Sequence, residues 1–401
     1  MRRFGTFVAV AALLVTSACS GSSDDGAGPS GTPGTRAVVL GFVNMEGAAA
    51  GSFAEAGAGA RAAVELVNEE LGGIDGRPLQ LASCTTNGTP ESSRGCAEEV
   101  LAKRPVAVVS GIDLGADASV PVVTKAGVPY VTGSPTLAGE LTTKGAYAFT
   151  GGTAADLLAI GDHLIEVKRA KSIHVLHEDL PGLLNAAIGA AGDIFRAKDV
   201  RDVKLVAEKA DTADFAPALT QAAAGDPDAL IVVFPAQACA RILRSAQALG
   251  IATPTYYVGA CASEGVVRSA SDDALRNAFF ASGYLPVFAA GGGADGAAFR
   301  DRVERAQRSP VSLASFSAVL NLARLMQEGA APEPAALRAA LEGTREEPGA
   351  LAHPYTCDGR QLALLRAVCN SNVRLLQHRD GAFVDVLGTW VSGARLNELI
   401  D

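Results

Sequence analysis

Aromatic residues and clustered basic residues are both scarce in this 401-residue sequence. Aromatic residues make up only 5% of the chain, which leaves little material for the base-stacking platforms of nucleic-acid-binding proteins. Acidic residues outnumber basic ones by 43 to 34, so the net charge is −9 and the pI is near 5.2. Nucleic acids and anionic membrane surfaces attract clustered Lys and Arg, and the charge balance therefore argues against both as partners.

Charge of either sign is also too scarce for a disordered chain. Charged residues make up 19% and hydrophobic residues 48% of the sequence, which is enough apolar material for a buried core. The 44 Gly and 19 Pro residues follow no collagen-like period. The length predicts two or three domains.

The sequence motifs of several common enzyme classes are missing. The chain contains no GxSxG nucleophile elbow, no GxxxxGK[ST] phosphate loop, no HExxH zinc motif and no CxxC pair. His174 and His177 lie three residues apart in a strand-like run, which places them on opposite faces. We therefore expect no catalytic residues, no metal site and no cofactor.

The first 36 residues are predicted to carry export signals rather than a folded domain. Arg2 and Arg3 precede an apolar run over residues 4–15, which is shorter than the roughly 18 residues needed to cross a bilayer. Small residues then lead to Cys19, an order that resembles a bacterial lipoprotein signal peptide (residues 1–19) whose cysteine becomes the lipidated N-terminus. An ordinary cleavable signal is the alternative. Residues 20–36 are rich in Gly, Ser and Pro and predict a flexible tether.

Six cysteines follow the signal segment: Cys84, Cys96, Cys239, Cys261, Cys357 and Cys369. An even number of cysteines in an exported chain predicts disulfide bonds, although six cysteines allow 15 pairings. Spacing favours three local pairs, with two pairs twelve residues apart and the Cys239–Cys261 pair twenty-two residues apart.

Short apolar runs alternate with longer amphipathic ones from Ala37 to about residue 260. The strand-like runs are residues 37–44, 78–84, 106–110 and 128–132, and then residues 172–177, 203–208, 229–234 and 255–260. Strict alternation of strand and helix predicts parallel sheets with helices on both faces. Two such blocks predict an α/β fold of two doubly wound lobes.

The pattern changes after Asn277. Residues 279–284 predict a strand that crosses back towards lobe 1, and helices are expected at about 295–308, 311–328 and 335–342. A Cys357–Cys369 hairpin and antiparallel strands at 373–377 and 382–387 should follow. Repeated crossing predicts a multi-strand hinge. We expect lobe 1 to comprise residues 37–150 and 280–345, and lobe 2 residues 151–279 and 346–401.

Several segments match a known family. They are GFVNMEG (41–47), ARAAVELVNEELGGIDGRPLQL (60–81), VAVVSG (106–111), AGVPYVTGSPT (126–136) and ALIVVFPAQACARILRSAQALGI (229–251). With these segments the chain resembles the type I periplasmic binding proteins of the leucine/isoleucine/valine-binding type, which are the substrate-binding components of ABC importers. The helix followed by GGIDGR is the most specific of these segments.

The resemblance implies two lobes that close on a small polar solute, an amino acid or a related molecule. It also implies an ABC permease as the membrane partner, a monomer, no enzymatic activity and a lipid-anchored position on the outer face of the cell membrane. Binding residues in the family lie on loops at strand C-termini, where helix N-termini present free N–H groups.

Transfer of the family's binding residues to this chain is partial. Thr136 matches the Thr of the family's Ser-Pro-x-x-Thr loop, whereas the Ser of the second loop is missing and Cys261 stands near the position of the family's acidic residue. The motif for α-amino acids is thus mostly eroded. The candidate ligand contacts are Phe53, Asp113, Leu114, Gly115, Ser134, Thr136, Asp179, Phe234 and Gln237. Asp113 has a helix cap as its alternative role, Asp179 a solvated loop charge, and Phe53 and Phe234 core packing.

Cys239 and Cys261 follow neighbouring strand positions at one sheet edge. In a parallel sheet their Cα atoms would lie within the roughly 4.4–6.8 Å that a disulfide tolerates. We hypothesise that this bond stiffens the lobe 2 wall of the cleft.

Three functional classes remain open at this point. Solute transport is the leading interpretation, a sensor of the same fold that signals to a membrane partner is the second, and a hydrolytic enzyme is the weakest.

Overall fold

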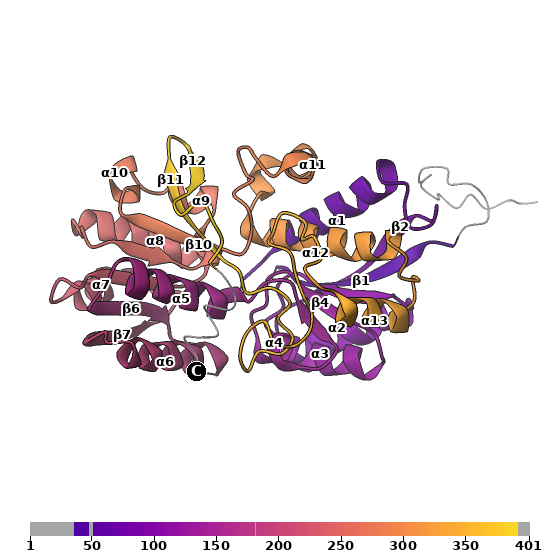
Figure 1. Cartoon of the computed structure of the whole chain (residues 1–401), viewed down its shortest axis with the longest axis horizontal. Coiled ribbons are helices and arrows are strands. Elements are labelled where there is room, and N and C mark those ends of the chain that lie inside the picture. Colours follow the sequence, from indigo (N-terminus) through magenta and orange to yellow (C-terminus); the bar gives the residue numbers. More distant parts are fainter. Residues whose placement is uncertain (1–35, 48–50, 181, 392–401) are drawn as a thin grey trace, which may run out of the picture. The chain divides into compact units, whose positions relative to one another are not determined.

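The computed structural model describes residues 36–47, 51–180 and 182–391 (Figure 1). The predicted signal peptide, Cys19 and, apart from Arg36, the predicted tether lie outside the described residues. Among the described residues, no helix is long and apolar enough to cross a membrane.

The first sheet is all parallel. It has the strand order β2-β1-β3-β4-β5, and its inner strand β1 is almost wholly buried. A strand buried on both faces explains the continuous apolar run in the sequence. Its strands are β1 (Val38–Met45), β2 (Leu79–Thr86), β3 (Ala107–Ser110), β4 (Tyr130–Thr132) and β5 (Ala146–Ala148), and its helices are α1 (Ala54–Glu69), α2 (Pro90–Ala102), α3 (Ala116–Lys125) and α4 (Ala138–Thr142).

A tight turn follows α1, and the conformation of its glycines explains it. Gly73 has a φ of 71°, and a Cβ atom there would lie 2.3 Å from the carbonyl oxygen of Arg77, so only glycine fits. Ile74 and Arg77 exchange backbone hydrogen bonds of 2.9 Å around the turn at Asp75-Gly76. This turn leads from α1 towards β2.

The second sheet is mixed, with the order β12-β11-β10-β9-β8-β6-β7. Strands β6 to β10 run parallel, whereas β11 is antiparallel to both β10 and β12. The strands are β6 (Ser172–Glu178), β7 (Asp202–Glu208), β8 (Ala229–Val233), β9 (Thr255–Tyr257), β10 (Ala278–Ser282), β11 (Arg374–Arg379) and β12 (Ala382–Asp385). The helices are α5 (Gly152–Asp162), which continues into a π-turn η1 (His163–Val167), α6 (Leu183–Ala197), α7 (Ala216–Ala223), α8 (Ala236–Ala248), η2 (Gly259–Cys261), α9 (Glu264–Val267) and α10 (Asp272–Leu275).

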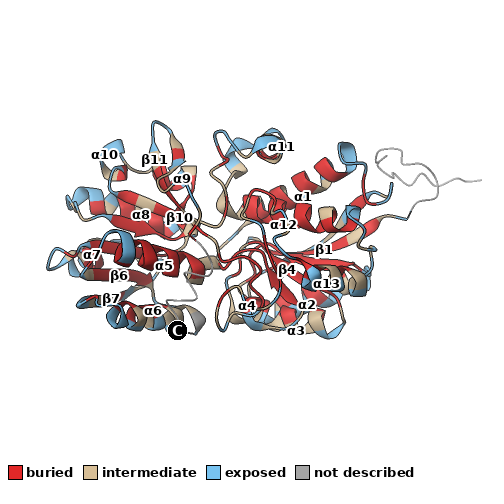
Figure 2. Ribbon diagram, in the orientation of Figure 1, coloured by how far each residue is buried: buried red, intermediate tan, exposed pale blue. Residues whose placement is uncertain are grey.

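The helices after β10 return to the first sheet. They are α11 (Gly293–Arg302), η3 (Arg305–Gln307), α12 (Pro310–Gln327) and α13 (Pro334–Gly343). Helix α12 lies along α1 (Figure 1), and α12 is buried along most of its length (Figure 2). The close approach needs Gly59 on α1, where a Cβ atom would lie 1.9 Å from the carbonyl oxygen of Ser312.

Two expected features of the C-terminal half differ from the structure. Residues 357–369 form turns rather than a hairpin, because their backbone groups bond to neighbouring segments instead of to each other as a ladder. Strand β10 pairs with β9 and β11 in the second sheet, whereas the expected lobe boundary divides it at residue 280. The division into lobes at the expected boundaries stays a prediction.

Candidate functional site

The candidate site consists of loops that follow the C-terminal ends of parallel strands. In the first sheet these loops follow β1, β3 and β4, and in the second sheet they follow β6, β8 and β9. The carboxyl ends of parallel strands share one edge of a sheet, where ligands of open α/β folds bind. The nine candidate contacts lie on five of these loops or at the helix starts that they lead into.

Asp113, in the loop after β3, is fully buried and its carboxylate is occupied by protein donors. It accepts hydrogen bonds from the hydroxyls of Ser93 (2.5 Å), Thr86 (3.2 Å) and Ser119 (3.2 Å), and from the backbone N–H of Gly115 (3.1 Å). This arrangement ties β2, α2 and α3 to the loop. A ligand contact for Asp113 stays a prediction.

The same network positions the neighbouring candidates. A Cβ atom on Gly115 would lie 2.1 Å from the hydroxyl oxygen of Ser93, so glycine is required there. Leu114 is half-buried between Asp113 and Gly115. Leu114 therefore lies on a loop whose backbone is held by these contacts.

Asn44, at the end of β1, links two of the loops and was missed by the sequence analysis. Its amide donates to the carbonyl of Phe53 (2.8 Å) and to the carboxylate of Glu46 (3.0 Å). Its side-chain oxygen accepts the N–H of Ile112 (3.0 Å). A polar residue at the end of a buried strand was the signal that could have identified it. Phe53 itself is half-buried before α1.

The loop after β4 is held by a second buried carboxylate, Glu140. Its Oε2 accepts the N–H groups of Thr136 (2.8 Å) and Leu137 (3.1 Å). Burial raises the pKa of Glu140 to about 7, although these two donors lower it. Thr136 is exposed and Ser134 is half-buried, so their hydroxyls can reach a solute.

The candidates of the second sheet differ in exposure. Asp179 and Gln237 are exposed, and Asp179 accepts a hydrogen bond from the amide of Asn185 (3.0 Å). Phe234 is buried and packs edge-on against Phe215, with ring centroids 5.4 Å apart. Phe234 therefore packs in the core, which is the alternative role given for it above. A ligand contact of Phe234 stays a prediction.

The structure contains the three disulfides that cysteine spacing favours: Cys84–Cys96, Cys239–Cys261 and Cys357–Cys369. The Cys239–Cys261 bond has a Cα–Cα distance of 5.7 Å and joins the first turn of α8 to the turn after β9. Both cysteines are fully buried. The bond links α8 to the turn after β9, and its stiffening of a cleft wall stays a prediction.

A third buried carboxylate, Asp156 on α5, accepts the N–H of Gly259 (2.8 Å) in the turn after β9. Burial raises the pKa of Asp156 to about 7, and the Gly259 N–H opposes this shift. Asp156 thus fixes the start of the β9 loop from the neighbouring helix.

Two adjoining hollows lie beside the chain that leaves β10. Their volumes are about 270 and 380 Å³, open solvent included. Both hollows are lined by Pro286, Phe288 and Phe383. None of the nine candidate contacts lines either hollow. In residues 36–47, 51–180 and 182–391, no cluster of His, Cys, Asp and Glu side chains could hold a metal ion.

Comparisons with known proteins agree with this architecture. A family model described as "Periplasmic binding protein" matches residues 39–364. A search of curated proteins found no match.

Several solved structures share the fold at low sequence identity. The branched-chain amino acid transporter substrate-binding protein LivJ of Streptococcus pneumoniae, in complex with isoleucine, is 22% identical, with a TM-score of 0.69 over 87% of this chain and 98% of its own. A solute-binding protein of R. palustris in complex with 4-hydroxybenzoate is 15% identical, with a TM-score of 0.69 and coverage of 89% and 96%. A fatty acid ABC transporter substrate-binding protein of Thermomonospora curvata is 13% identical, with a TM-score of 0.71 and coverage of 88% and 91%.

Proposed function

The chain belongs to the periplasmic binding protein family, and on this premise we propose that it is the lipid-anchored, extracytoplasmic solute-binding component of an ABC importer. The observation that carries the proposal is the pair of sheets whose strand C-termini bear polar, partly exposed loops.

The solute is captured between loops of the two sheets. Contacts that need both sets of loops form only in the closed state, so the bound solute shifts the population towards closure. The closed form is the one that the membrane permease recognises. In this mechanism the solute leaves unaltered.

The proposed solute is a small polar molecule, an amino acid or a relative of one. Similar structures are described with isoleucine, with 4-hydroxybenzoate and as a fatty acid binder, so the fold accepts several ligand classes. The loops here carry Asp113 and Asp179 and no arginine, which disfavours a strongly anionic solute.

A thermal-shift panel tests the proposal. The full mature chain is heated with leucine, isoleucine, valine, 4-hydroxybenzoate, a medium-chain fatty acid and a set of polyols and amides. A bound solute at 100 times its Kd should add about 2.7 kcal/mol to the free energy of unfolding. The compound must be recovered unaltered. Turnover of that compound by the purified protein would reject a pure binding role.

Thr136 and Gln237 allow a direct test of the loops. Both are exposed, so Thr136→Ala and Gln237→Ala should fold normally. We expect each to weaken binding of the best compound by about ten-fold, the value of one hydrogen bond. Gln221→Ala, an exposed glutamine on α7, is the matched control and should leave the affinity unchanged. Equal affinity in the wild type and the three variants would show that these loops do not contact the solute.

A further inference from the structure

Asp156 on α5 has fewer donors than the other two buried carboxylates of the candidate site. Asp113 accepts four hydrogen bonds, and Glu140 accepts two backbone N–H groups and the hydroxyl of Tyr130. Among the described residues, Asp156 accepts only the N–H of Gly259, at Oδ2 (2.8 Å), and forms no ion pair with Lys, Arg or His. A buried charge without a counter-charge costs free energy. The ionised form of Asp156 therefore lacks a positive partner that the described chain does not supply.

The second oxygen of Asp156, Oδ1, has no donor among the described residues and is still reachable. Only 7% of the residue's surface is exposed, so the side chain is more than nine-tenths buried. Oδ1 is not enclosed, in contrast to the two ring nitrogens of His163 just beyond α5, which are buried without a partner. The small exposed part of Asp156 therefore includes this oxygen.

Asp156 lies where α5 meets the ends of two parallel strands. A Cβ atom on Gly259, just after β9, would lie 3.0 Å from Oδ2 of Asp156 and 3.3 Å from the carbonyl oxygen of Ala281 in β10. The missing side chain at position 259 thus lets the carboxylate approach both strand ends. The C-terminal ends of parallel strands form the ligand-binding edge of an α/β sheet. Asp156 therefore lies at this edge of the second sheet, although it belongs to a helix.

The start of α5 also lies against a candidate loop of the first sheet. Gly152 opens α5 with a φ of 55°, and a Cβ atom there would lie 2.6 Å from the carbonyl oxygen of Pro135. Pro135 stands between the candidate contacts Ser134 and Thr136. Asp156 follows four residues after Gly152, about 6 Å along the helix. It is therefore close to candidate loops of both sheets.

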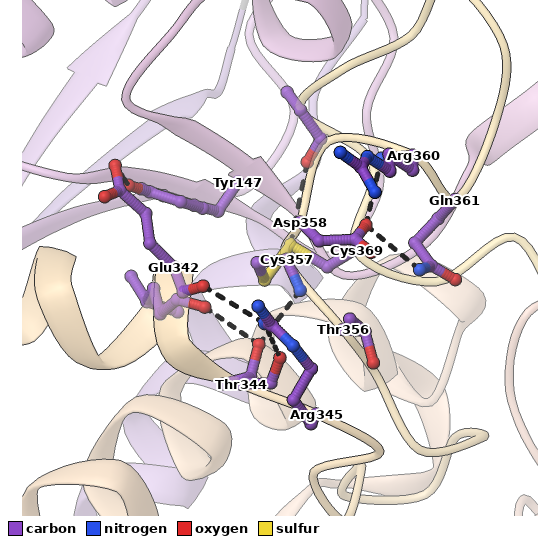
Figure 3. The surroundings of a disulfide bond; sticks show 12 residues. Tyr147, Glu342, Thr344, Arg345, Thr356, Cys357, Asp358, Arg360, Gln361 and Cys369 are labelled. Atoms are coloured by element: carbon purple, nitrogen blue, oxygen red, sulfur yellow. Dashed lines mark hydrogen bonds between the residues drawn. A yellow bond between two sulfur atoms is a disulfide. The ribbon is translucent and has the colours of Figure 1, made fainter.

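A disulfide-closed loop supports the same end of α5. A Cβ atom on Gly151 would lie 3.6 Å from Leu362, which belongs to the loop closed by Cys357–Cys369 (Figure 3). The N–H of Cys369 donates to the carbonyl of Ala148 in β5 (2.8 Å), the strand that leads to α5. The start of the helix is thus held in place, and binding groups on held elements need little rearrangement when a ligand arrives.

We propose that Asp156 is a ligand-binding residue whose carboxylate receives a positively charged group of the solute, such as a primary ammonium. The inference rests on the proposed function and narrows its solute to cationic or zwitterionic compounds. An N–H of the solute donates to Oδ1, while the N–H of Gly259 keeps its bond to Oδ2. Burial raises the pKa of Asp156 to about 7 in the free protein, and a bound cation favours the ionised form.

The binding test compares compounds that differ in their amino groups. Leucine is paired with 4-methylpentanoate, and 1,4-diaminobutane with 1,4-butanediol, in calorimetric titrations of the full mature chain at pH 8. The wild type should bind the amine of at least one pair at least ten-fold more tightly than its counterpart. Asp156→Asn keeps an acceptor for the Gly259 N–H and removes the charge. It should bind that amine at least ten-fold more weakly, as expected for the loss of a hydrogen bond between charged groups.

Asp199→Asn is the matched control for the loss of one negative charge. Asp199 is exposed just before β7, at the opposite edge of the same sheet, and its φ of 66° is one that asparagine tolerates. This variant should bind the amine as tightly as the wild type. Equal affinity of the wild type and Asp156→Asn for the amine, or binding of uncharged or anionic solutes alone, would overturn the inference and leave the proposed function standing. A wild type that binds no compound of either panel would overturn both.

A measurement without solute checks that the carboxylate is open. The wild type is treated with a water-soluble carbodiimide and glycinamide at pH 7, and the labelled carboxyl groups are located by mass spectrometry. Asp156 should be labelled, whereas Asp113, which is fully buried and accepts four hydrogen bonds, should not. A bound amine should reduce the labelling of Asp156. An Asp156 that stays unlabelled in the free protein would overturn the inference even if a solute binds.

Discussion

Three buried carboxylates hold the loops of the candidate site, and each does so in a different way. Asp113 gathers three hydroxyls and one N–H, Glu140 accepts two N–H groups, and Asp156 accepts one. Donated hydrogen bonds favour the charged form of a carboxylate, whereas burial disfavours it. Burial prevails at Glu140 and Asp156 and raises both pKa values to about 7.

Asp113→Ala should lower the free energy of unfolding by about 3 kcal/mol, because it leaves buried hydroxyls and an N–H without their charged acceptor. Asp211→Ala, at an exposed position, should change the free energy by less than about 0.5 kcal/mol. Urea unfolding of both variants checks the difference. Equal values would mean that Asp113 does not support the loop.

Asp156 should make the protein less stable as the pH rises. Its pKa is about 7 in the folded protein and 3.8 ordinarily, so folding favours the protonated form. The stabilisation is complete below pH 3.8 and is lost as the pH rises through about 7. Three pKa units correspond to at most about 4 kcal/mol.

Asp156→Asn isolates this contribution, since asparagine keeps an acceptor for Gly259 N–H and never ionises. The variant should match the wild type near pH 4 and exceed its stability near pH 8. Denaturation at both pH values measures the two differences. A constant difference between them would rule out the raised pKa.

At the scale of helices and strands, the features that could be predicted are those determined by residues adjacent in the sequence. Gly72, Gly73, Asp75 and Gly76 have positive φ values and form the turn after α1, and the side chain of Thr89 caps α2 immediately before Pro90. The turns between Cys357 and Cys369 were missed because their backbone partners, such as Ala148, are far away in sequence.

The candidate site was predicted less well than the fold for the same reason. Sequence position placed Asp113 on the loop after β3, but its hydroxyl partners come from β2, α2 and α3. Whether a polar side chain turns inward or towards a solute depends on such partners. Glu140 and Asp156 were missed because nothing adjacent to them marks their role, whereas the position of Asn44 at the end of a buried strand was a signal that was not used.

Replacing each of two helical glycines by alanine should change the free energy of unfolding in opposite directions. Gly59→Ala should cost about 1–3 kcal/mol, because the added methyl group meets the Ser312 carbonyl of α12. Gly189→Ala on α6 meets no atom within 4 Å and should stabilise by up to about 1 kcal/mol. Thermal unfolding of the pair provides the measurement. A stabilising Gly59→Ala would show that α1 and α12 are not closely packed.

At the scale of the whole molecule, the chain combines a folded binding protein with the proposed lipid attachment at Cys19. That attachment is tested in bacteria by metabolic labelling with a clickable fatty acid. Cys19→Ala should abolish labelling and release the protein from the membrane fraction. Thr16→Ala should retain both, since it keeps a small residue shortly before Cys19. Labelling that survives Cys19→Ala would favour an ordinary cleavable signal.

The edges of both sheets are also poorly suited to pairing with a strand of another protein chain. Residues 367–369 cover the β5 edge, and the Cys84–Cys96 disulfide joins β2 to α2. In the second sheet β12 has only four residues, and the outer strand β7 carries Asp202, Lys204 and Glu208. Short and charged borders of this kind resist aggregation by β-pairing. Protection of this kind keeps copies of the chain from associating through their sheet edges.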